Sequence, residues 1–423
     1  MALAVIHGAI LLVPDWRSLL LVVMFAWLAF NVTMATIGKE PRATRSPPHP
    51  YRHPSVVVIV ATRDGSAMAL RAMLDSLDRQ LPLSRKGHVN PIAAVYVVEN
   101  GTPGVGTEEA FRAWQSSTSI PRTEFVRRSR PDKREAHGAA IIRELDADIT
   151  LTLDCYTVLE PEAVREGLRP FRDPEVMSVG GLLYGRNHDR NFLTRILDIH
   201  FVSSLVVERV AGSRFGAVAA NRGGLAFYRT WVVRRYLGNY LSQTVRGRRV
   251  TSGDDRMLTG FAALEGKTVF RPQCSGTTLL PESLRHACDR QSRWWRTHWL
   301  GTLWVIRGFR PTSALWLLTV FQTVAFIVQS AAIPLLLVID PIVNGYIPWA
   351  FISYLLILGY VRGLLTLAVK RDGQSAGRQI AGFVLLCPLA TLVDLWLSVV
   401  LLWHGFLTQH QTEWQPHKVK VGV

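Results

Sequence analysis

Cysteine is scarce in this sequence, and acidic residues are outnumbered by basic ones. Four cysteines occur among the 423 residues, and no two of them form a CxxC pair. This spacing fits neither a zinc site nor a disulfide framework, so we expect reduced thiols at Cys155, Cys274, Cys288 and Cys387. Lys and Arg number 48 against 32 Asp and Glu, which gives a net charge of +16. The excess positive charge indicates an anionic partner, such as nucleic acid, anionic lipid, a phosphorylated ligand or a polyanion.

Charge is absent from long stretches near both ends of the chain. Residues 18–38 contain no Asp, Glu, Lys or Arg, and about 21 helical residues cross a bilayer core of roughly 30 Å. A buried helix of a soluble domain is the alternative interpretation. Residues 312–361 contain one formally charged residue, Asp340. This block predicts two spans, at about 312–337 and 347–369, with a hinge between Asp340 and Gly345.

Two other apolar segments allow two interpretations each. Residues 2–13 are apolar but short, so they form either a shortened first span or an interfacial helix. Residues 380–403 carry Pro388 and Asp394. This segment either spans the membrane or enters and leaves by the same face, which buried backbone permits.

The basic residues that flank these segments predict their orientation. Lys39 and Arg45 follow the first span, Arg310 precedes the next one, and Lys370 and Arg371 follow the span that ends near residue 369. The loop at 339–347 has no basic residue. By the positive-inside rule, the chain is a multi-pass protein of the cell membrane whose large central domain is cytoplasmic.

The same features predict the domain organisation. The expected parts are N-terminal transmembrane helices (1–38), a Pro-rich basic linker (39–54), a cytoplasmic domain (55–285), interfacial amphipathic helices (286–310), two transmembrane helices (311–370), and a re-entrant or third membrane segment with a tail (371–423).

Three apolar, β-branched runs in the central domain each end in polar residues. The runs at 55–62, 93–98 and 149–153 read as buried strands, and helical stretches at about 67–80 and 135–145 alternate with them. This alternation predicts a doubly wound α/β sheet. Ligands bind outside the carboxyl ends of strands in such sheets, although a solvated turn explains any single strand end equally well.

Three charged motifs are candidates for chemistry. Lys133-Arg134 precede a helix and suit a diphosphate, unless they form a solvated basic turn. Asp254 and Asp255 are adjacent carboxylates that repel each other, so one is expected to have a raised pKa and to act as a base, whereas a helix N-cap explains only one of them.

The third motif, residues 290–299, interleaves Arg with Trp. Arg binds phosphates and an indole stacks on a sugar ring, but both residue types also anchor helices at lipid headgroups. For Trp299 and Trp304 we expect the anchoring role alone, whereas for Arg293 and Trp294 both interpretations stay open at this point.

An ordered set of motifs resembles the membrane-embedded processive glycosyltransferases of family 2. The set consists of VATRDG (60–65), VVENGT (97–102), DKREA (132–136), LDCYTVLEP (153–161), GGLAFYR (223–229), SGDDRMLT (252–259), RQSRWW (290–295) and TEW (412–414). It covers nearly the whole chain and is most similar to bacterial hyaluronan synthases, which are relatives of chitin and cellulose synthases. The resemblance implies a GT-A-like cytoplasmic domain, inverting transfer from UDP-sugars such as UDP-GlcNAc and UDP-GlcA, and export of the polysaccharide.

The resemblance also implies roles for individual residues. Asp255 would be the general base, with Asp254 and Arg256 shaping its turn. The nucleotide-sugar would be bound by Thr62, Asp64, Glu99, Lys133, Arg134, Asp154 and Arg293. The acceptor would contact Gly223, Gly224, Leu225, Gln291 and Trp294, and Trp414 would lie in a gating tail.

Four departures from the family pattern bear on these roles. Tyr156 stands where the metal loop has its second Asp, and a phenol is a poor ligand for Mg²⁺ or Mn²⁺. The metal would then be held by Asp154 or Glu160, be bound weakly, or not be required. Arg290 replaces a Gln, Glu99 replaces an Asp, and Gln-Pro-His follows Trp414 in place of Gly-Thr-Arg.

The expected partners are UDP-sugar donors, a growing polysaccharide and membrane lipids, and not nucleic acid, because the membrane segments and the donor account for the charge. Three alternatives stay open at this point. They are a chitin-like or glucan-like homopolymer synthase, a non-processive transferase acting on a lipid phosphate, and a channel or transporter with a cytosolic regulatory domain.

Overall fold

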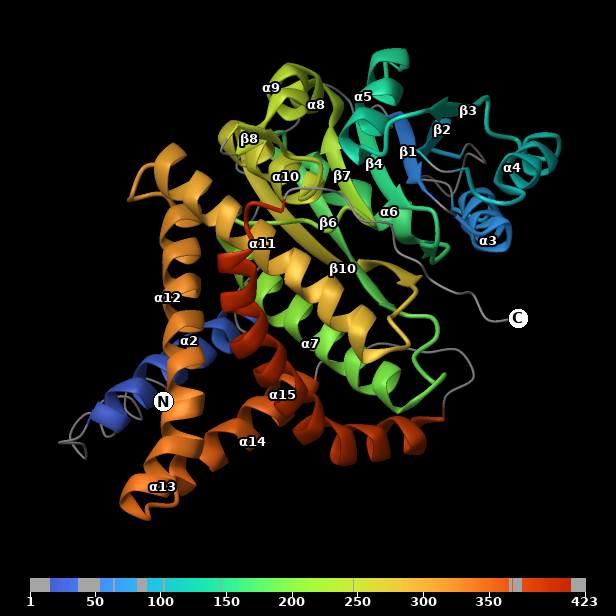
Figure 1. Cartoon of the computed structure of the whole chain (residues 1–423). Coiled ribbons are helices and arrows are strands. Elements are labelled where there is room, and N and C mark those ends of the chain that lie inside the picture. The colour runs from blue at the N-terminus through green and yellow to red at the C-terminus, as the bar shows by residue number, and fades with distance from the viewer. Residues whose placement is uncertain are drawn as a thin grey trace. The chain divides into compact units, whose positions relative to one another are not determined.

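The computed structural model describes residues 16–36, 54–63, 65–81, 90–101, 103–144, 146–245, 247–364, 367 and 375–411. They fall into two compact units (Figure 1). The sheet unit is drawn from residues 40–187, 215–279 and 410–423, and the helical unit is drawn from residues 1–39, 188–214 and 280–409.

The sheet unit is built on an eight-stranded mixed sheet in the order β3-β2-β1-β4-β7-β6-β10-β5. Its strands are β1 (Val56–Thr62), β2 (Ile92–Asn100), β3 (Arg122–Arg128), β4 (Ile149–Asp154), β5 (Val158–Leu159), β6 (Val176–Gly185), β7 (Leu225–Arg229) and β10 (Lys267–Thr278). Strands β1 to β4 are parallel. Strand β7 runs antiparallel to both β4 and β6, and β5 runs antiparallel to β10. The predicted GT-A-like α/β sheet is therefore confirmed. It contains both parallel and antiparallel strands.

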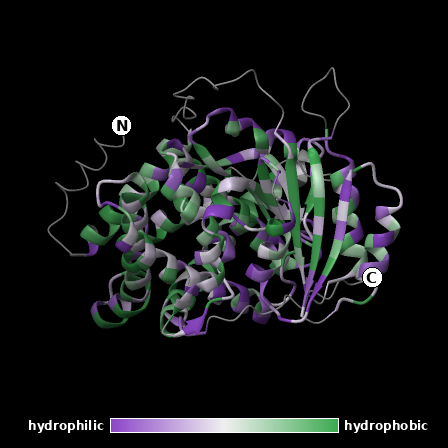
Figure 2. Cartoon of the chain, turned by 90° about the horizontal axis from the view of Figure 1, so that it is seen from above, coloured by the Kyte–Doolittle hydropathy of each residue, from purple (hydrophilic) through white to green (hydrophobic). Residues whose placement is uncertain are grey.

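Burial of β-branched side chains explains why these runs form central strands. All seven residues of β1 are buried, and Figure 2 shows hydrophobic residues along most of the strands of the sheet. Each fully buried Val or Ile stabilises the fold by roughly 1.5–3 kcal/mol. A run that is apolar on both faces suits a strand covered by helices on both sides.

The helices of the sheet unit are α3 (Ala67–Asp78), α4 (Thr107–Gln115), α5 (Lys133–Arg143), α6 (Ala163–Leu168), α8 (Thr230–Arg235), α9 (Leu237–Ser242) and α10 (Asp254–Glu265), with a 3₁₀ turn (Arg169–Arg172). A short hairpin pairs β8 (Thr244–Val245) with β9 (Arg248–Arg249). Side-chain caps begin two helices: Ser66 accepts from the Ala69 N–H, and Asp132 accepts from the Arg134 and Glu135 N–H groups.

The strand register brings three strand ends to one edge of the sheet. Thr62 of β1 lies opposite Glu99 of β2, and Ala61 lies opposite Asp154 of β4. Leu153 of β4 pairs with Leu225, the first residue of β7. Polar residues at the ends of β1, β2 and β4 therefore gather with the turn that precedes β7.

The helical unit contains α2 (Trp16–Thr36), α7 (Phe192–Arg214), α11 (Leu284–Gly308), α12 (Ala314–Pro334), a π-helical turn (Leu335–Ile339), α13 (Asp340–Asn344), α14 (Trp349–Gly363) and α15 (Ala376–Leu407). The presence of α7 differs from the predicted division, which kept 55–285 together. Helix α7 packs against α2, α14 and α15. Charged residues interrupt its apolar ones, so hydropathy alone did not group it with the apolar helices.

Among the described residues of this unit, three helices are long and apolar enough to cross a membrane, judged by length and composition: Arg17–Thr36, Ala314–Asn344 and Gln379–Leu407. The hinge predicted near Gly345 is present, because Gly345 ends α13 in the left-handed conformation. Asp340 and Pro341 are the first residues of α13 and do not form a hinge, because α13 follows directly on the π-helical turn. Segment 380–403 lies within one continuous helix, α15, which is bent (Figure 1); Pro388 inside it removes a backbone hydrogen bond and accounts for a bend. Residues 2–13 lie outside the described residues.

An ion pair joins segments of the helical unit that are far apart in sequence. The Arg17 guanidinium donates to both carboxylate oxygens of Asp340, with Nε and Nη2 at 2.8 and 2.7 Å. Asn344 donates to the same carboxylate at 2.7 Å, and the guanidinium lies 5.1 Å above the ring of Tyr346. A bidentate pair of this kind fixes the start of α2 against α13.

Candidate active site

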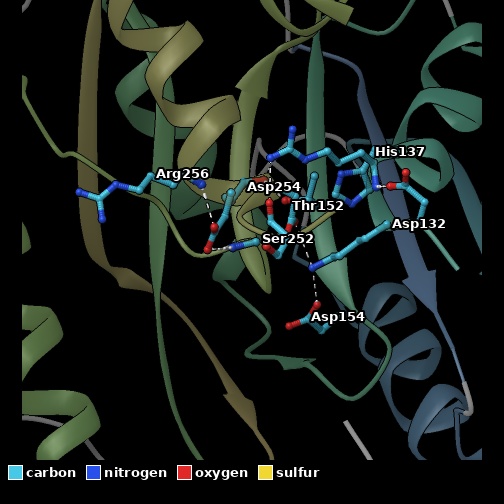
Figure 3. Close-up of polar contacts among 12 residues, drawn as sticks. Asp132, His137, Thr152, Asp154, Ser252, Asp254 and Arg256 are labelled. Atoms are coloured by element: carbon cyan, nitrogen blue, oxygen red, sulfur yellow. Dashed lines mark hydrogen bonds and ion pairs between the residues drawn. The ribbon is translucent and has the colours of Figure 1, made fainter. Parts of the chain in front are cut away.

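A buried lysine joins two carboxylates at the polar edge of the sheet. The Nζ atom of Lys133 lies 2.9 Å from Oδ1 of Asp154 and 3.2 Å from Oδ2 of Asp254. Lys133 and Asp254 are each 8% exposed. Figure 3 shows Asp154 and Asp254 within this group of polar contacts. These three residues, which we call the Lys133 cluster, were all among the predicted site residues, and the fold brings them together.

The ends of three secondary-structure elements create the Lys133 cluster. Lys133 is the first residue of α5, which begins after the Asp132 cap. Asp154 is the last residue of β4, and Asp254 is the first residue of α10. Gly253 precedes α10 with φ of 68°, a left-handed conformation that glycine adopts without strain. The positive end of α10 also favours the two carboxylates of its first turn.

The turn at Gly223-Gly224 packs directly against these carboxylates. A Cβ atom on Gly223 would lie 2.9 Å from Oδ2 of Asp254 and 3.4 Å from Nζ of Lys133. A Cβ atom on Gly224 would lie 2.9 Å from Oδ2 of Asp154. The Gly223 N–H points to Oδ2 of Asp255 at 3.4 Å, and the other oxygen of Asp255 accepts from the Arg256 N–H at 2.7 Å. Only glycine leaves room for this close approach of the backbone.

The electrostatics of the Lys133 cluster favour the charged forms of Lys133 and Asp254. Burial by itself would lower the pKa of Lys133, but the attraction of Asp154 and Asp254 outweighs it, and the pKa lies well above its usual value. Burial would likewise raise the pKa of Asp254, yet Lys133 and other nearby basic groups hold it below its usual value. The repulsion argument predicted a raised pKa for one of the two adjacent aspartates. Asp254 is not that residue, because its carboxylate faces the ammonium of Lys133.

The pKa of Arg256 is also shifted by burial. Burial lowers the pKa of its guanidinium to about 10, against the opposing influence of Asp255. Arg256 therefore remains charged at neutral pH beside Asp255, consistent with a residue that shapes this turn.

Arg134 makes contacts different from those of its neighbour Lys133. Its guanidinium donates to the carbonyl oxygens of Tyr240 and Ser252, at 3.2 and 2.8 Å, and to Oε1 of Gln243 at 2.6 Å. Adjacent helical residues point in different directions, so the two cations separate. Arg134 therefore fixes the segment that leads into α10. Its contact with the nucleotide-sugar stays a prediction.

The sequence did not point to His137 or Tyr240, although both adjoin the Lys133 cluster. Nδ1 of His137 lies 2.9 Å from the hydroxyl of Tyr240, and among the described residues its Nε2 has no hydrogen-bond partner. Burial lowers the pKa of His137 to about 4. Position 137 is four residues after Lys133 on the same helix, and this spacing places both on one face. That spacing was the available signal.

His137 should make the stability of the protein depend on pH. Its pKa is lower folded than unfolded, so the unfolded chain binds the proton more tightly and stability falls as pH drops through the range from 6.5 to 4. Between pH 7 and pH 5 this amounts to about 2 kcal/mol. The measurement is thermal unfolding of the detergent-solubilised chain at both pH values, compared with His137→Gln. The melting temperature of the wild type should fall more between pH 7 and pH 5 than that of His137→Gln. Equal falls in the two proteins would contradict this account.

Two predicted nucleotide-binding residues end the neighbouring strands. Thr62 is buried at the end of β1. Glu99, 2% exposed at the end of β2, accepts from the Gly104 N–H at 2.9 Å and from the Thr107 hydroxyl at 2.6 Å. Its second oxygen lies 3.3 Å from Nε of Arg127. Glu99 therefore organises the loop after β2, whatever its contact with a ligand.

The predicted residues of the RQSRWW motif lie on α11, in the helical unit. The guanidinium of Arg290 stacks on Trp294 and on Phe201 of α7, with its carbon 5.0 and 5.4 Å from the two ring centroids. Gln291 and Arg293 are half-buried on the same helix. Trp299 was expected to anchor at headgroups, but it is buried and its indole donates to the Leu402 carbonyl at 3.0 Å. Asp64 and Trp414 lie outside the described residues.

The residues around Asp154 do not suit a divalent metal ion. Tyr156 follows in the position where a second carboxylate was expected, and Lys133 places a positive charge 2.9 Å from Asp154. Glu160, the other candidate, accepts a short hydrogen bond from the hydroxyl of Tyr184. Within the part of the chain that the structure describes, no three His, Cys, Asp or Glu side chains gather as a metal site. Mg²⁺ and Mn²⁺ favour sites rich in carboxylate oxygen.

Comparison with known proteins decides the family. Residues 149–403 match the model described as "Glycosyl transferase family group 2". A hyaluronan synthase of Streptococcus pyogenes is 30% identical over 376 residues, which cover 88% of this chain and 84% of that protein. The chain belongs to glycosyltransferase family 2. The predicted family is confirmed, and this family 2 chain is an enzyme that transfers a sugar from a donor to an acceptor.

Other relatives share the family and the fold. An N-acetylglucosaminyltransferase of Rhizobium sp. (strain N33) is 27% identical over 86% of this chain and 77% of its own. Among solved structures, a mannosyltransferase from Pyrobaculum calidifontis in complex with GDP-Man and Mn²⁺ has a TM-score of 0.58 at 18% identity, over 89% of this chain and 99% of that chain. That likeness supports the GT-A fold of this family 2 chain.

Proposed function

We propose that this chain is a membrane-integrated, processive glycosyltransferase that polymerises UDP-sugars and exports the polysaccharide. A hyaluronan-type donor pair, UDP-GlcNAc and UDP-GlcA, is the combination that the relatives favour. The Lys133 cluster, with Asp255 beside it, carries the proposal. It gathers a buried cation, the carboxylate at the end of β4 and the carboxylates of α10 around a turn of two glycines.

Each of these residues has a place in an inverting transfer. Asp255 takes the proton of an acceptor hydroxyl, and that oxygen attacks the anomeric carbon as the bond to UDP breaks. Negative charge grows on the departing diphosphate, and the buried ammonium of Lys133 stabilises it. Gly223 and Gly224 bring their backbone close to the carboxylates of Asp254 and Asp154, and the acceptor is expected to contact this turn. No step passes through a divalent metal, because the residues around Asp154 do not suit one.

The helical unit supplies the membrane part of the proposal. Its three long apolar helices have the length to cross a bilayer. Arg293 and Trp294 remain the predicted contacts for the diphosphate and for the acceptor sugar. The basic flanks of the spans support a cytoplasmic position for the sheet unit.

A homopolymer synthase that uses UDP-GlcNAc alone is the second candidate, favoured by relatives named N-acetylglucosaminyltransferase. A panel of single UDP-sugars and their pairs, incubated with the purified full chain, distinguishes the two by UDP release and polymer length. We expect sustained UDP release and long product only when UDP-GlcNAc and UDP-GlcA are both present. Polymer from one donor would establish the homopolymer synthase, and no release from any donor would contradict both.

A further inference from the structure

The Lys133 cluster includes Asp154, the residue at the end of β4 that was predicted to hold a metal ion. Asp154 is the one carboxylate of the segment 154–157, and its Oδ1 is already paired with the ammonium of Lys133 at 2.9 Å. The same ammonium reaches Asp254 at 3.2 Å. One fixed cation therefore neutralises carboxylates from both β4 and α10.

The ammonium keeps capacity for a further ligand. It has three N–H donors, and among the described residues two of them are used, by Asp154 and Asp254. The Lys133 side chain is 10% exposed, so a third donor can reach a group at the open side of the cluster.

A divalent ion would meet two obstacles at this position. It would lie next to the ammonium of Lys133, which is 2.9 Å from Asp154 and 3.2 Å from Asp254, and like charges repel at this range. It would also find a phenol in place of a carboxylate at Tyr156. Both features work against a site of the usual kind.

We propose that Lys133 replaces the divalent cation in this enzyme, so that sugar transfer does not require a metal. This inference rests on the proposed function. The bond from the anomeric carbon to the diphosphate oxygen breaks, and its electron pair goes to the leaving UDP. The acceptor oxygen forms the new bond and loses its proton to Asp255. The ammonium of Lys133 stabilises the charge on UDP throughout, and no co-reactant is needed.

The test compares metal dependence in the wild type, in Tyr156→Asp and in the matched control Tyr156→Asn, which removes the phenol without adding a charge. UDP release from the donor pair is measured in excess EDTA and in Mn²⁺, UDP affinity is measured by calorimetry under both conditions, and bound Mn²⁺ is counted from the free-ion EPR signal. For the wild type, we expect rate and affinity in EDTA within about twofold of those in Mn²⁺, whereas a metal-dependent site would lose about a hundredfold.

Tyr156→Asp should create the missing ligand. We expect this variant to bind Mn²⁺ in the presence of UDP, and to bind UDP more tightly with the metal than without it, while Tyr156→Asn behaves as the wild type does. The inference is overturned if EDTA abolishes wild-type UDP binding and release and Mn²⁺ restores them, and this wild-type result decides the matter even if the variants fail to fold. Absence of UDP binding under both conditions would instead overturn the proposed function, and this inference with it.

Discussion

Asp255→Asn should abolish incorporation of sugar from UDP-sugars into polymer. The amide keeps the size of the carboxylate, and its single carbonyl oxygen can still accept from one of the two N–H groups of Gly223 and Arg256, but it cannot take a proton from the acceptor. Loss of a general base costs about 10²–10⁴-fold in rate. We expect this loss in the turnover number, with UDP affinity unchanged, because the change leaves Lys133 and Asp154 in place. Radiolabel incorporation by membranes and UDP binding by the purified chain measure the two quantities.

Asp146→Asn is the matched control for this substitution. Asp146 is an exposed carboxylate that precedes β4, so its amide variant changes the net charge by the same amount without touching the Lys133 cluster. The control should retain wild-type incorporation. Wild-type polymer yield from Asp255→Asn would remove this residue from its proposed role, and equal losses in both variants would point to charge alone.

The strands of the parallel half of the sheet were predictable because their physical signal is local. Val56–Thr62 and Ile149–Asp154 are apolar, β-branched and bounded by polar residues, so composition and length suffice. The direction of β7 carries no such signal. Its residues Leu225–Arg229 would suit either direction, and only its pairing with both β4 and β6 sets it antiparallel. Helix α7 likewise joins the helical unit through packing that no hydropathy window reveals.

The candidate site was predictable as a set of motifs but not as a network. The resemblance to family 2 selected Lys133, Asp154, Gly223 and Asp254, and the fold brings these residues into contact. It did not show that Lys133 lies between the two carboxylates, because residue types carry no partner information. The pair Lys133-Arg134 illustrates this limit. The sequence presents two equivalent cations, whereas helix geometry directs one of them to the carboxylates and the other to backbone carbonyls.

Lys133→Met should lower both stability and activity. The substitution leaves Asp254 buried without its closest cation, and removing one partner of a buried ion pair costs about 3–5 kcal/mol. Loss of a group that stabilises the departing diphosphate should also slow UDP release by about 10²–10³-fold. The melting temperature of the purified protein measures the first effect, and UDP release from the donor pair measures the second.

The double variant Lys133→Met/Asp254→Asn separates the structural effect from the chemical one. With the buried charge of Asp254 removed, much of the lost stability should return, since an uncharged amide tolerates burial beside methionine better than a carboxylate does. Activity should not return, because no ammonium faces the diphosphate. A double-mutant cycle on the free energies of unfolding then gives the interaction energy between Lys133 and Asp254. If Lys133→Met melts as the wild type does, the two residues do not interact as the 3.2 Å contact indicates. If the double variant recovers UDP release with stability, Lys133 acts through folding alone and has no part in the transfer.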